Sequence, residues 1–457
     1  MVINERILQN HYNLSRECGE LTRALCEDDD ARFLRLDKSR PGSPPFITKY
    51  LRDVSPWPLL FSSETRDRFM GIVSEVPSLI LRAARRYYEY DPASFRARYP
   101  MPDLAYEKLS DTYEQNNLMF RCDFLLVDGN LKLIEMNVGA KCGGWQVHWF
   151  WSQLADITRQ RAISRNWKLS HANILERYCR YIHRSSQAHV GEAATGNILL
   201  TISPYFKDLN LDEEAAAIYD QALAGVPRPG KLLVDVAADD LVINSDGRAE
   251  YRGLVLDGIL ASSELLSMPP ELCEAHFKRL VFYPDNALHM LVTDKTAFAI
   301  LHLAKASGWL DERDARLVEH HVPWSAFLTT DVVEWNGERA SALDMALARR
   351  EALVLKRGLS YGGKEVFVGR FLSDQEWTTV IEQAGATGEW IIQEYCPPDR
   401  LYAPNDNCEV TEHDVVWGLF GLGREYGGGF GRLMEPHLGR GVVNAQRGAK
   451  MGVILEV

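Results

Sequence analysis

The clearest alternation of apolar and polar residues lies between positions 121 and 137, in the sequence RCDFLLVDGNLKLIEMN. A period of two is typical of strands, and the Asp-Gly pair in the middle predicts a tight turn between two of them. In such a hairpin the side chains of Glu135 and Asn137, two residues apart, share one face of the second strand. Asp123 lies on the first strand, so we expect oxygen atoms of all three side chains to converge.

The other apolar patterns predict a mixture of helices and strands. The first hundred residues are mostly helical in pattern, with proline clusters at 41–46 and 55–58, and a further helical pattern covers about 149–187. Between about 190 and 285, a strand, an acidic alanine-rich helix and the strands KLLVDVAADDL and AEYRGLVLDGILA predict a small doubly wound domain. The last third contains glycine-punctuated strands without intervening long helices, which indicates an antiparallel sheet.

The chain length suggests more than one domain, because 457 residues exceed what a single hydrophobic core normally serves. We expect a helical region together with the hairpin over 1–187, a small α/β domain over 188–285, and the antiparallel region over 286–457. The expected fold class is therefore α/β, or α+β, with antiparallel sheets beside a smaller doubly wound domain.

Charge and cysteine content narrow the function classes. The chain has 51 Lys and Arg against 63 Asp and Glu, a net charge of −12, which argues against nucleic acid as a partner. The eight cysteines form no CxxC pair, which argues against structural zinc and against a disulfide framework. The beginning of the chain lacks a signal pattern, and no apolar run reaches the roughly 18 to 20 residues of a membrane span. We expect a cytoplasmic protein with no membrane partner.

The hairpin residues have the chemistry of a magnesium site. Mg²⁺ prefers oxygen donors and takes only a few from protein, as Asp123, Glu135 and Asn137 would supply. Arg121 shares a strand face with Asp123, so a phosphate or carboxylate held there would meet a planar fork of donors. The alternative is that the two acids are surface residues and Asn137 caps a turn. The apolar surroundings of Glu135 favour the metal site, because burying an unpaired carboxylate is costly.

A second group lies in KRGLSYGGK, residues 356–364, between two apolar strands. Lys356 ends the first strand, from which it could reach phosphates, and glycines after it let backbone N–H groups approach a triphosphate. No Walker A loop is present, because the GxxxxGK[ST] pattern is missing. An ordinary glycine-rich hairpin turn is the alternative. The candidate nucleotide contacts in the loop are Gly358, Ser360, Tyr361, Gly362 and Gly363.

Two further segments suit a nucleotide. The apolar strand before Gln393, Glu394 and Tyr395 ends in polar residues, and the backbone at the edge of such a strand typically reads adenine while Gln or Glu side chains take the amine or ribose hydroxyls. Asp294 and Lys295 precede the helix TAFAILHLAKA, whose beginning would aim Lys295 at an anion. The plainer alternatives are a helix-start charge for Asp294 and a solvated side chain for Lys295.

Together these motifs resemble the ATP-grasp ligases, in particular their circularly permuted branch, which includes glutathionylspermidine synthase and eukaryotic-type glutathione synthetase. The resemblance to the permuted branch rests on the order of the motifs along the chain. R-x-D-F at 121–124 and E-x-N at 135–137 precede Lys295 and Lys356, whereas in common ATP-grasp enzymes the metal-binding residues follow the lysines. The likeness covers 118–146 and 286–457. It implies a circularly permuted ATP-grasp fold with antiparallel nucleotide-binding sheets and a smaller substrate-binding domain.

The resemblance also implies roles for single residues. Asp123, Glu135 and Asn137 would hold Mg²⁺, most simply two ions, and Arg121 would contact the transferred phosphate. Lys295 and Lys356 would be the two nucleotide lysines, and 393–395 the adenine hinge of bound ATP. Arg432, in GGGFGRLMEP, stands where related ligases bind a substrate carboxylate, with a surface arginine as the alternative. The chain departs from the family in lacking a glutamate in the phosphate loop and an N-terminal amidase domain.

The function implied is an ATP-dependent carboxylate–amine ligase that forms an amide through an acyl phosphate and releases ADP and phosphate. Its partners would be small molecules, an amino acid or short peptide carboxylate and an amine, and the charge of −12 favours a cationic or amphoteric amine over a polyanionic one. The glycine-rich loop 358–363 would act as a lid over the acyl phosphate. The alternatives are a small-molecule kinase and a catalytically inactive nucleotide-binding scaffold. The sequence leaves the oligomeric state open between a monomer and a homodimer.

Overall fold

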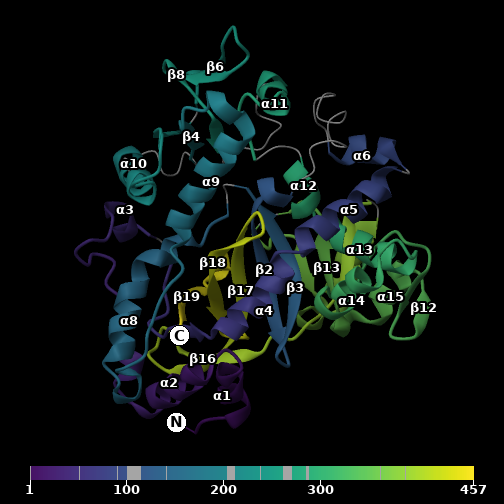
Figure 1. The fold of residues 1–457 in the computed structure, drawn as a ribbon. Helices are drawn as coiled ribbons and strands as arrows, with labels where there is room; N and C mark the ends of the chain where they lie inside the picture. Colours follow the sequence, from purple (N-terminus) through teal and green to yellow (C-terminus); the bar gives the residue numbers. More distant parts are fainter. Residues whose placement is uncertain are drawn as a thin grey trace.

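The chain folds into a mixed α+β structure, seen in a computed structural model (Figure 1). The structure describes residues 2–50, 52–89, 91–99, 115–139, 142–202, 211–236, 238–260, 270–284, 288–360, 362–385 and 388–457. Within this part of the chain, no helix is long and apolar enough to cross a bilayer.

Helices occur along the whole length of the chain. They are α1 Glu5–Tyr12, α2 Arg16–Glu27, α3 Pro45–Thr48, α4 Ser63–Val73, α5 Val76–Glu89, α6 Pro92–Arg98, α8 Trp151–Arg159, α9 Ile174–Val190, α10 Leu211–Ala222, α11 Pro270–Phe277, α12 Leu288–Thr293, α13 Thr296–Ala306, α14 Glu312–His321, α15 Ala342–Ala348 and α16 Asp374–Gly385. The helix predicted from TAFAILHLAKA is confirmed as α13.

In the part of the chain that the structure describes, the strands fall into five sheets. They are β1 Leu59–Phe61, β2 Met119–Val127, β3 Asn130–Val138, β4 Ile198–Thr201, β5 Leu232–Asp235, β6 Leu241–Ile243, β7 Ala249–Tyr251, β8 Leu254–Val255, β9 Gly258–Leu260, β10 Ser325–Phe327, β11 Val333–Trp335, β12 Glu338–Ala340, β13 Leu353–Arg357, β14 Val366–Val368, β15 Trp390–Glu394, β16 Arg400–Pro404, β17 Val410–Leu422, β18 Glu425–Met434 and β19 Lys450–Glu456.

The largest sheet has the order β1-β19-β18-β17-β2-β3, with β16 also paired to β17. All of its pairings are antiparallel except that of β1 with β19. An aromatic cluster of Phe61, Phe69, Phe124 and Trp417 fills one face, where α4 packs, with ring centroids 5.2–6.2 Å apart. The polar residues of the hairpin therefore lie on the opposite face, because side chains alternate along a strand.

The hairpin predicted from the alternation is confirmed as β2–β3. Its turn residues Asp128 and Gly129 both have positive φ, 47° and 75°, as a two-residue hairpin turn requires. Asp123 is paired with Glu135, whereas Phe124 is paired with Leu133, so β3 carries one extra residue between them. Such a bulge bends the strand and redirects the groups beside it.

The second sheet, β10-β15-β13-β14, is antiparallel throughout, which confirms the prediction for the last third of the chain. α15 and α16 cover one of its faces, where Leu353, Leu355 and Ile392 pack against Trp377 and Ile381. β15 lies between β10 and β13, so our expectation that this strand forms an edge is wrong.

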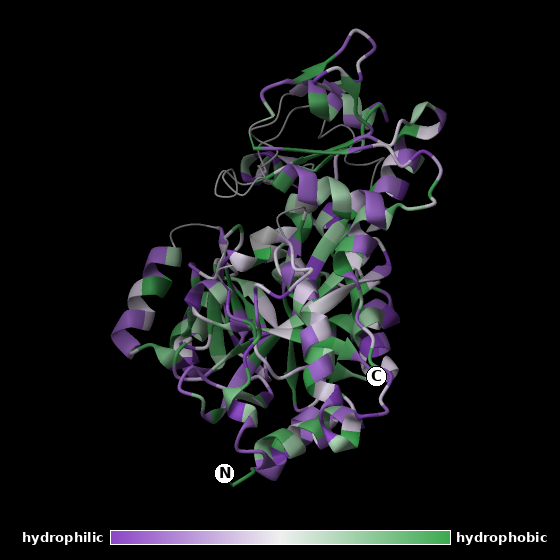
Figure 2. Ribbon diagram, turned by 90° about the vertical axis from the view of Figure 1, so that its left-hand side faces the viewer, coloured by the Kyte–Doolittle hydropathy of each residue, from purple (hydrophilic) through white to green (hydrophobic). Residues whose placement is uncertain are grey.

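The small unit between α9 and α11 lies at the top of the molecule, apart from the two large sheets (Figures 1 and 2). β4 is parallel to both β5 and β9, and α10 connects β4 to β5, as predicted. The segment AEYRGLVLDGILA, predicted as one strand, instead forms β7, β8 and β9. A turn with positive φ at Arg252 and Gly253 divides it, and the meander β6-β7-β8 replaces a second crossover helix.

Two other expectations need correction. The predicted helix over 149–187 is two helices, α8 and α9, because the segment between them packs along β19, where Ser170 bridges to Glu456. The proline-rich segment at 55–58 leads into β1, which pairs with the last strand of the chain and was not predicted. The pairing joins residues almost four hundred positions apart, for which a local pattern gives no signal.

Candidate active site

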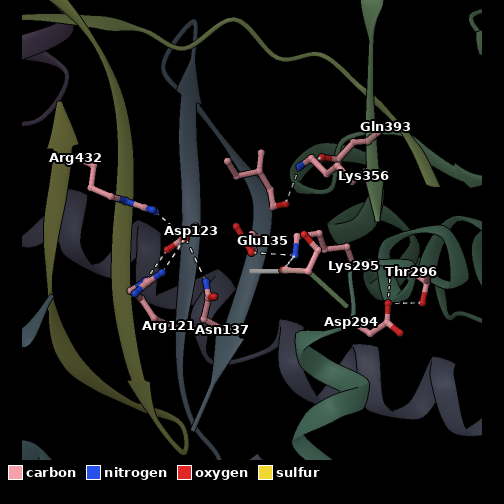
Figure 3. Close-up of polar contacts among 12 residues, drawn as sticks. Arg121, Asp123, Glu135, Asn137, Asp294, Lys295, Thr296, Lys356, Gln393 and Arg432 are labelled. Carbon is pink, nitrogen blue, oxygen red and sulfur yellow. Dashed lines mark hydrogen bonds and ion pairs between the residues drawn. The ribbon is translucent and has the colours of Figure 1, made fainter. Parts of the chain in front are cut away.

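The active-site candidates lie between the two large sheets. Figure 3 shows side chains of β2, β3 and β18 on one side, and those of α13, β13 and β15 on the other. We call Arg121, Asp123, Asn137 and Arg432 the arginine cluster, and Glu135, Lys295, Lys356 and Gln393 the lysine cluster. The structure thus brings together eight residues predicted from separate motifs.

Asp123 is the centre of the arginine cluster and is only 1% exposed. Arg121 donates to both of its oxygens, from Nε over 2.7 Å and from Nη2 over 3.1 Å, and Asn137 Nδ2 donates to Oδ2 over 3.2 Å. Burial alone would raise the pKa of Asp123, but the guanidinium groups of Arg121 and Arg432 outweigh it and lower that pKa. Asp123 is therefore an ionised carboxylate at neutral pH.

Arg432 enters the cluster from β18. Its Nη2 lies 2.6 Å from Asp123 Oδ2, an ion pair whose angles do not make a hydrogen bond. Within the described part of the chain, the buried Nε of Arg432 has no hydrogen-bond partner. The ring of Phe430 lies 5.6 Å from the Arg121 guanidinium and 6.0 Å from that of Arg432. Buried N–H groups without a partner are rare, so this donor indicates a place for an anion.

Lys295 connects the hairpin to the glycine-rich loop. Its Nζ lies 3.1 Å from Glu135 Oε1 and donates to the carbonyl of Ser360 over 2.6 Å. Its backbone N–H donates to the carbonyl of Gly358 over 3.2 Å. Lys295 is 3% exposed, so the alternative of a solvated side chain is wrong.

Lys356 lies at the end of β13 and is also buried. Its Nζ donates to Gln393 Oε1 over 2.6 Å and to the carbonyl of Ile134 over 3.1 Å. Ile134 is the extra residue of the β3 bulge, which directs its carbonyl at the lysine. Burial lowers the pKa of Lys356 to about 8, the carboxylate of Glu135 opposes that shift, and Lys295 adds to it.

Gln393 lies on an inner strand of its sheet, and its side chain accepts a hydrogen bond from Lys356. Its Nε2 donates to Ser325 Oγ over 3.0 Å, and Ser325 donates to the carbonyl of Pro323. The backbone N–H groups of the next two residues are also engaged: Glu394 donates to Trp324 and Tyr395 to Ala352, both over 2.8 Å. These N–H groups therefore complete the sheet, contrary to the expected edge.

The glycine-rich loop connects β13 and β14, as predicted. Gly362 and Gly363 both have φ of 69°, a conformation that favours glycine. Arg447 Nη2 donates to the carbonyl of Gly363 over 2.8 Å. The hydroxyl of Ser360 is buried and has no partner among the described residues. Tyr361, another predicted contact, lies outside the described residues.

The donor set of the hairpin fits Mg²⁺. Asp123 and Glu135 face each other across the ladder, and Asn137 follows on the same face, which offers two carboxylates and one amide. Mg²⁺ uses one or two protein carboxylates and takes its other ligands from water and substrate phosphates. Among the described residues, no group of three or more His, Cys, Asp or Glu side chains is placed to hold a metal ion.

Three parts of the site were not predicted from the sequence. Ser325 positions Gln393, the carbonyl of Ile134 accepts from Lys356, and the Phe430 ring lies beside both arginines. Phe430 stands two residues before Arg432 on β18, so strand alternation could have placed it on the same face. Ser325 and Ile134 act through sheet register and a bulge, which have no local sequence signal.

Comparisons with known proteins find one similar fold that covers nearly the whole chain. No protein-family model matches the sequence, and a search of curated proteins finds no match. Among solved structures, a glutathione synthetase-like effector from Globodera pallida, in its apo form, superposes over 96% of both chains with a TM-score of 0.59. The fold is similar to that of a glutathione synthetase-like protein. The two sequences are 11% identical, so the likeness concerns the fold alone.

Proposed function

We propose that the protein is an ATP-dependent carboxylate–amine ligase of the circularly permuted ATP-grasp type. The observation that carries the proposal is that four cationic side chains lie close together between the two large sheets. Lys295, Lys356 and Arg432 are buried, the side chain of Arg121 is 12% exposed, and Glu135 is in contact with Lys295. Four cationic groups against two carboxylates make a positive site in a chain of net charge −12, which suits a triphosphate and a second anion.

In this proposal the lysine cluster binds the nucleotide. Lys295 and Lys356 are held by oxygen atoms of Glu135, Gln393, Ser360 and Ile134, so ATP phosphates meet preorganised cations. The glycine-rich loop covers the phosphates and excludes water from the acyl phosphate. The backbone carbonyls and side chains of residues 393–395 lie beside the adenine.

Mg²⁺ would be held by Asp123, Glu135 and Asn137. When bound, it offsets charge on the transferred phosphoryl group. Arg121 donates to the oxygens of that group, and Arg432, whose Nε is unpartnered, binds the substrate carboxylate. Because Arg121 and Arg432 belong to one cluster, the carboxylate would lie beside the γ-phosphate in this proposal.

The proposed reaction has two steps, phosphoryl transfer and attack by the amine. A carboxylate oxygen of the amino acid or short peptide takes the γ-phosphoryl group, the bond from the γ-phosphorus to the β,γ-bridging oxygen breaks, and ADP leaves. The amine then attacks the acyl carbon, phosphate leaves with the electron pair of the carbon–oxygen bond, and the amine loses a proton. The protein positions the groups and stabilises charge, as is usual in phosphoryl transfer.

The test is phosphate release from ATP and Mg²⁺ in the presence of pools of amino acids, short peptides and polyamines, with Glu135→Ala as the inactive control. We expect ADP and phosphate to appear only when a carboxylate and an amine are both present. AMP with pyrophosphate would contradict the acyl phosphate. A phosphorylated product without an amine would indicate a kinase, and ATP binding without turnover in every pool would indicate a scaffold.

A further inference from the structure

A buried ion pair outside both clusters lies directly beneath the glycine-rich loop. Arg98, the last residue of α6, donates to Asp294 from Nε over 2.6 Å to Oδ2 and from Nη2 over 2.9 Å to Oδ1. The side chain of Asp294 is fully buried, and that of Arg98 is 14% exposed. Burial alone would lower the pKa of Arg98, but the charge of Asp294 outweighs it and raises that pKa.

Further donors fix the Asp294 carboxylate. Tyr99 donates its hydroxyl over 2.8 Å to Oδ2, and Thr296 donates both its backbone N–H and its hydroxyl to Oδ1, over 2.9 and 2.7 Å. Asp294 therefore ties the start of α13 to the end of α6. Lys295, which binds Glu135 and the loop, is the residue between Asp294 and Thr296.

The first glycine of the loop packs on this ion pair. A Cβ on Gly358 would lie 2.2 Å from Arg98 Nη2 and 2.4 Å from Asp294 Oδ1. The φ of Gly358 is not positive, so the glycine is required by space rather than by backbone conformation. The carbonyl of Gly358 accepts from the N–H of Lys295, and its N–H donates to the carbonyl of Glu389 over 2.9 Å.

We propose that Arg98 is a positioning residue for the nucleotide site, which acts through Asp294 and Gly358 to place Lys295 and the glycine-rich loop. The proposal deepens the ligase function and rests on it for the role of ATP. A buried ion pair contributes little net stability compared with apolar packing, because desolvation offsets its attraction. Its bidentate geometry instead fixes the relative placement of α6, α13 and the loop.

The main test uses Arg98→Lys, which keeps the charge and loses the planar fork. Arg82→Lys is the matched control, because Arg82 on α5 has a side chain that is 59% exposed and pairs with Asp314 of α14 over 2.6 Å. In the ligand-free protein we expect amide hydrogen exchange at Gly358 and Lys295 to accelerate about tenfold in the Arg98 variant and not in the control. ATP affinity, measured by calorimetric titration with Mg²⁺, should fall about tenfold.

Gly358→Ala disturbs the same contact from the side of the loop. It becomes the main test if thermal melting shows that Arg98→Lys does not fold. We expect the same two effects, and in the double variant Arg98→Ala/Gly358→Ala losses that are less than additive, because the clashing guanidinium is gone. Unchanged exchange and unchanged ATP affinity in both single variants would overturn the proposal. If wild type binds no ATP, the ligase function fails, while accelerated exchange would still support positioning of the loop.

Discussion

The hairpins β2–β3 and β13–β14 face each other and hold their polar groups in different ways. In β2–β3, two nine-residue strands joined by a two-residue turn set Arg121, Asp123, Glu135 and Asn137 by ladder register alone. In β13–β14 a long loop separates short strands, and the contacts come from other elements: Gln393 of β15 accepts from Lys356, and Lys295, which precedes α13, donates to Ser360 of the loop. In the first hairpin the carboxylate of Asp123 is surrounded by hydrogen-bond donors. At the second hairpin the ammonium groups of Lys295 and Lys356 are surrounded by oxygen acceptors.

This difference suggests separate roles for the lysine cluster and the arginine cluster in the proposed site. The lysine cluster holds charge that only an incoming anion can balance, since Gln393, Ser360 and Ile134 offer neutral oxygens and Glu135 is the one carboxylate in the cluster. The arginine cluster already contains its counter-ion, Asp123. Nucleotide affinity should therefore depend on the lysines, and turnover on the arginines.

Removing Arg121 should have the largest effect. Arg121→Ala should lower turnover roughly a hundredfold or more, the loss typical when one donor to a transition-state oxyanion is removed. ATP affinity should stay close to wild type. Steady-state kinetics with the identified substrates would measure both, and Arg121→Lys, which keeps charge without the fork, should recover only part of the rate. A loss of ATP affinity with unchanged turnover would reverse the assignment of the two clusters.

Glu135→Gln should come next, because this residue both belongs to the Mg²⁺ donor set and pairs with Lys295. We expect the Mg²⁺ concentration for half-maximal activity to rise about tenfold to a hundredfold. The matched control is Glu334→Gln, an exposed carboxylate on β11 in the separate two-stranded sheet β11-β12, which should leave the magnesium titration unchanged. Identical titrations for wild type and Glu135→Gln would contradict the metal assignment.

The pH dependence should report the lysine cluster. Because the pKa of Lys356 is about 8 in the folded protein, kcat/KM for ATP should fall about tenfold per pH unit above that value as the cation is lost. Stability should change in the opposite direction. The unfolded chain keeps the ordinary pKa of 10.5, so the contribution of Lys356 to the free energy of unfolding rises between pH 8 and 10.5 and is lost as the pH falls again.

Lys356→Arg separates this titration from that of other groups. Burial is the main cause of the lowered pKa of Lys356, with Glu135 opposing the shift and Lys295 adding to it, whereas an arginine in its place stays protonated throughout. The fall of kcat/KM near pH 8 should therefore disappear in the variant. A fall that persists unchanged would assign it to another group.

The smallest effect should come from Ser325→Ala, which removes the neutral partner of Gln393 Nε2. ATP affinity should drop about threefold to tenfold, the range for one uncharged hydrogen bond. Ser39→Ala, at an exposed turn, is the control in the same calorimetric titration. An unchanged affinity would show that sheet packing alone holds Gln393 against Lys356.

The same comparison explains what the sequence could predict. Arg121, Asp123, Glu135 and Asn137 follow from alternation, because a period of two assigns each side chain to a face. The contact of Lys356 with Gln393 depends on the pairing of β13 with β15, and the contact with Ile134 on a bulge, so local pattern could not supply them. The expected start of the helix TAFAILHLAKA suggested Lys295, and the resemblance to permuted ligases suggested Arg432.

The fold follows the same rule. The predicted elements with strong local signals, the β2–β3 turn and helix α13, are confirmed. The errors concern long-range pairing and interrupted apolar runs: β1 beside β19, β15 inside its sheet, and the meander that begins after β5. For β1 and β15 the deciding contact is with residues distant in the sequence, so tertiary packing overrides the local pattern. The meander instead depends on a local turn at Arg252 and Gly253, which have positive φ.

Equilibrium titration of ATP with Mg²⁺ into wild type, Lys356→Met and Arg121→Met tests the division between the clusters most directly. We expect Lys356→Met to weaken ATP binding about tenfold or more, because it loses a charged donor to phosphate, and Arg121→Met to bind ATP like wild type. Equal ATP affinity in wild type and Lys356→Met, or a loss confined to Arg121→Met, would contradict this division.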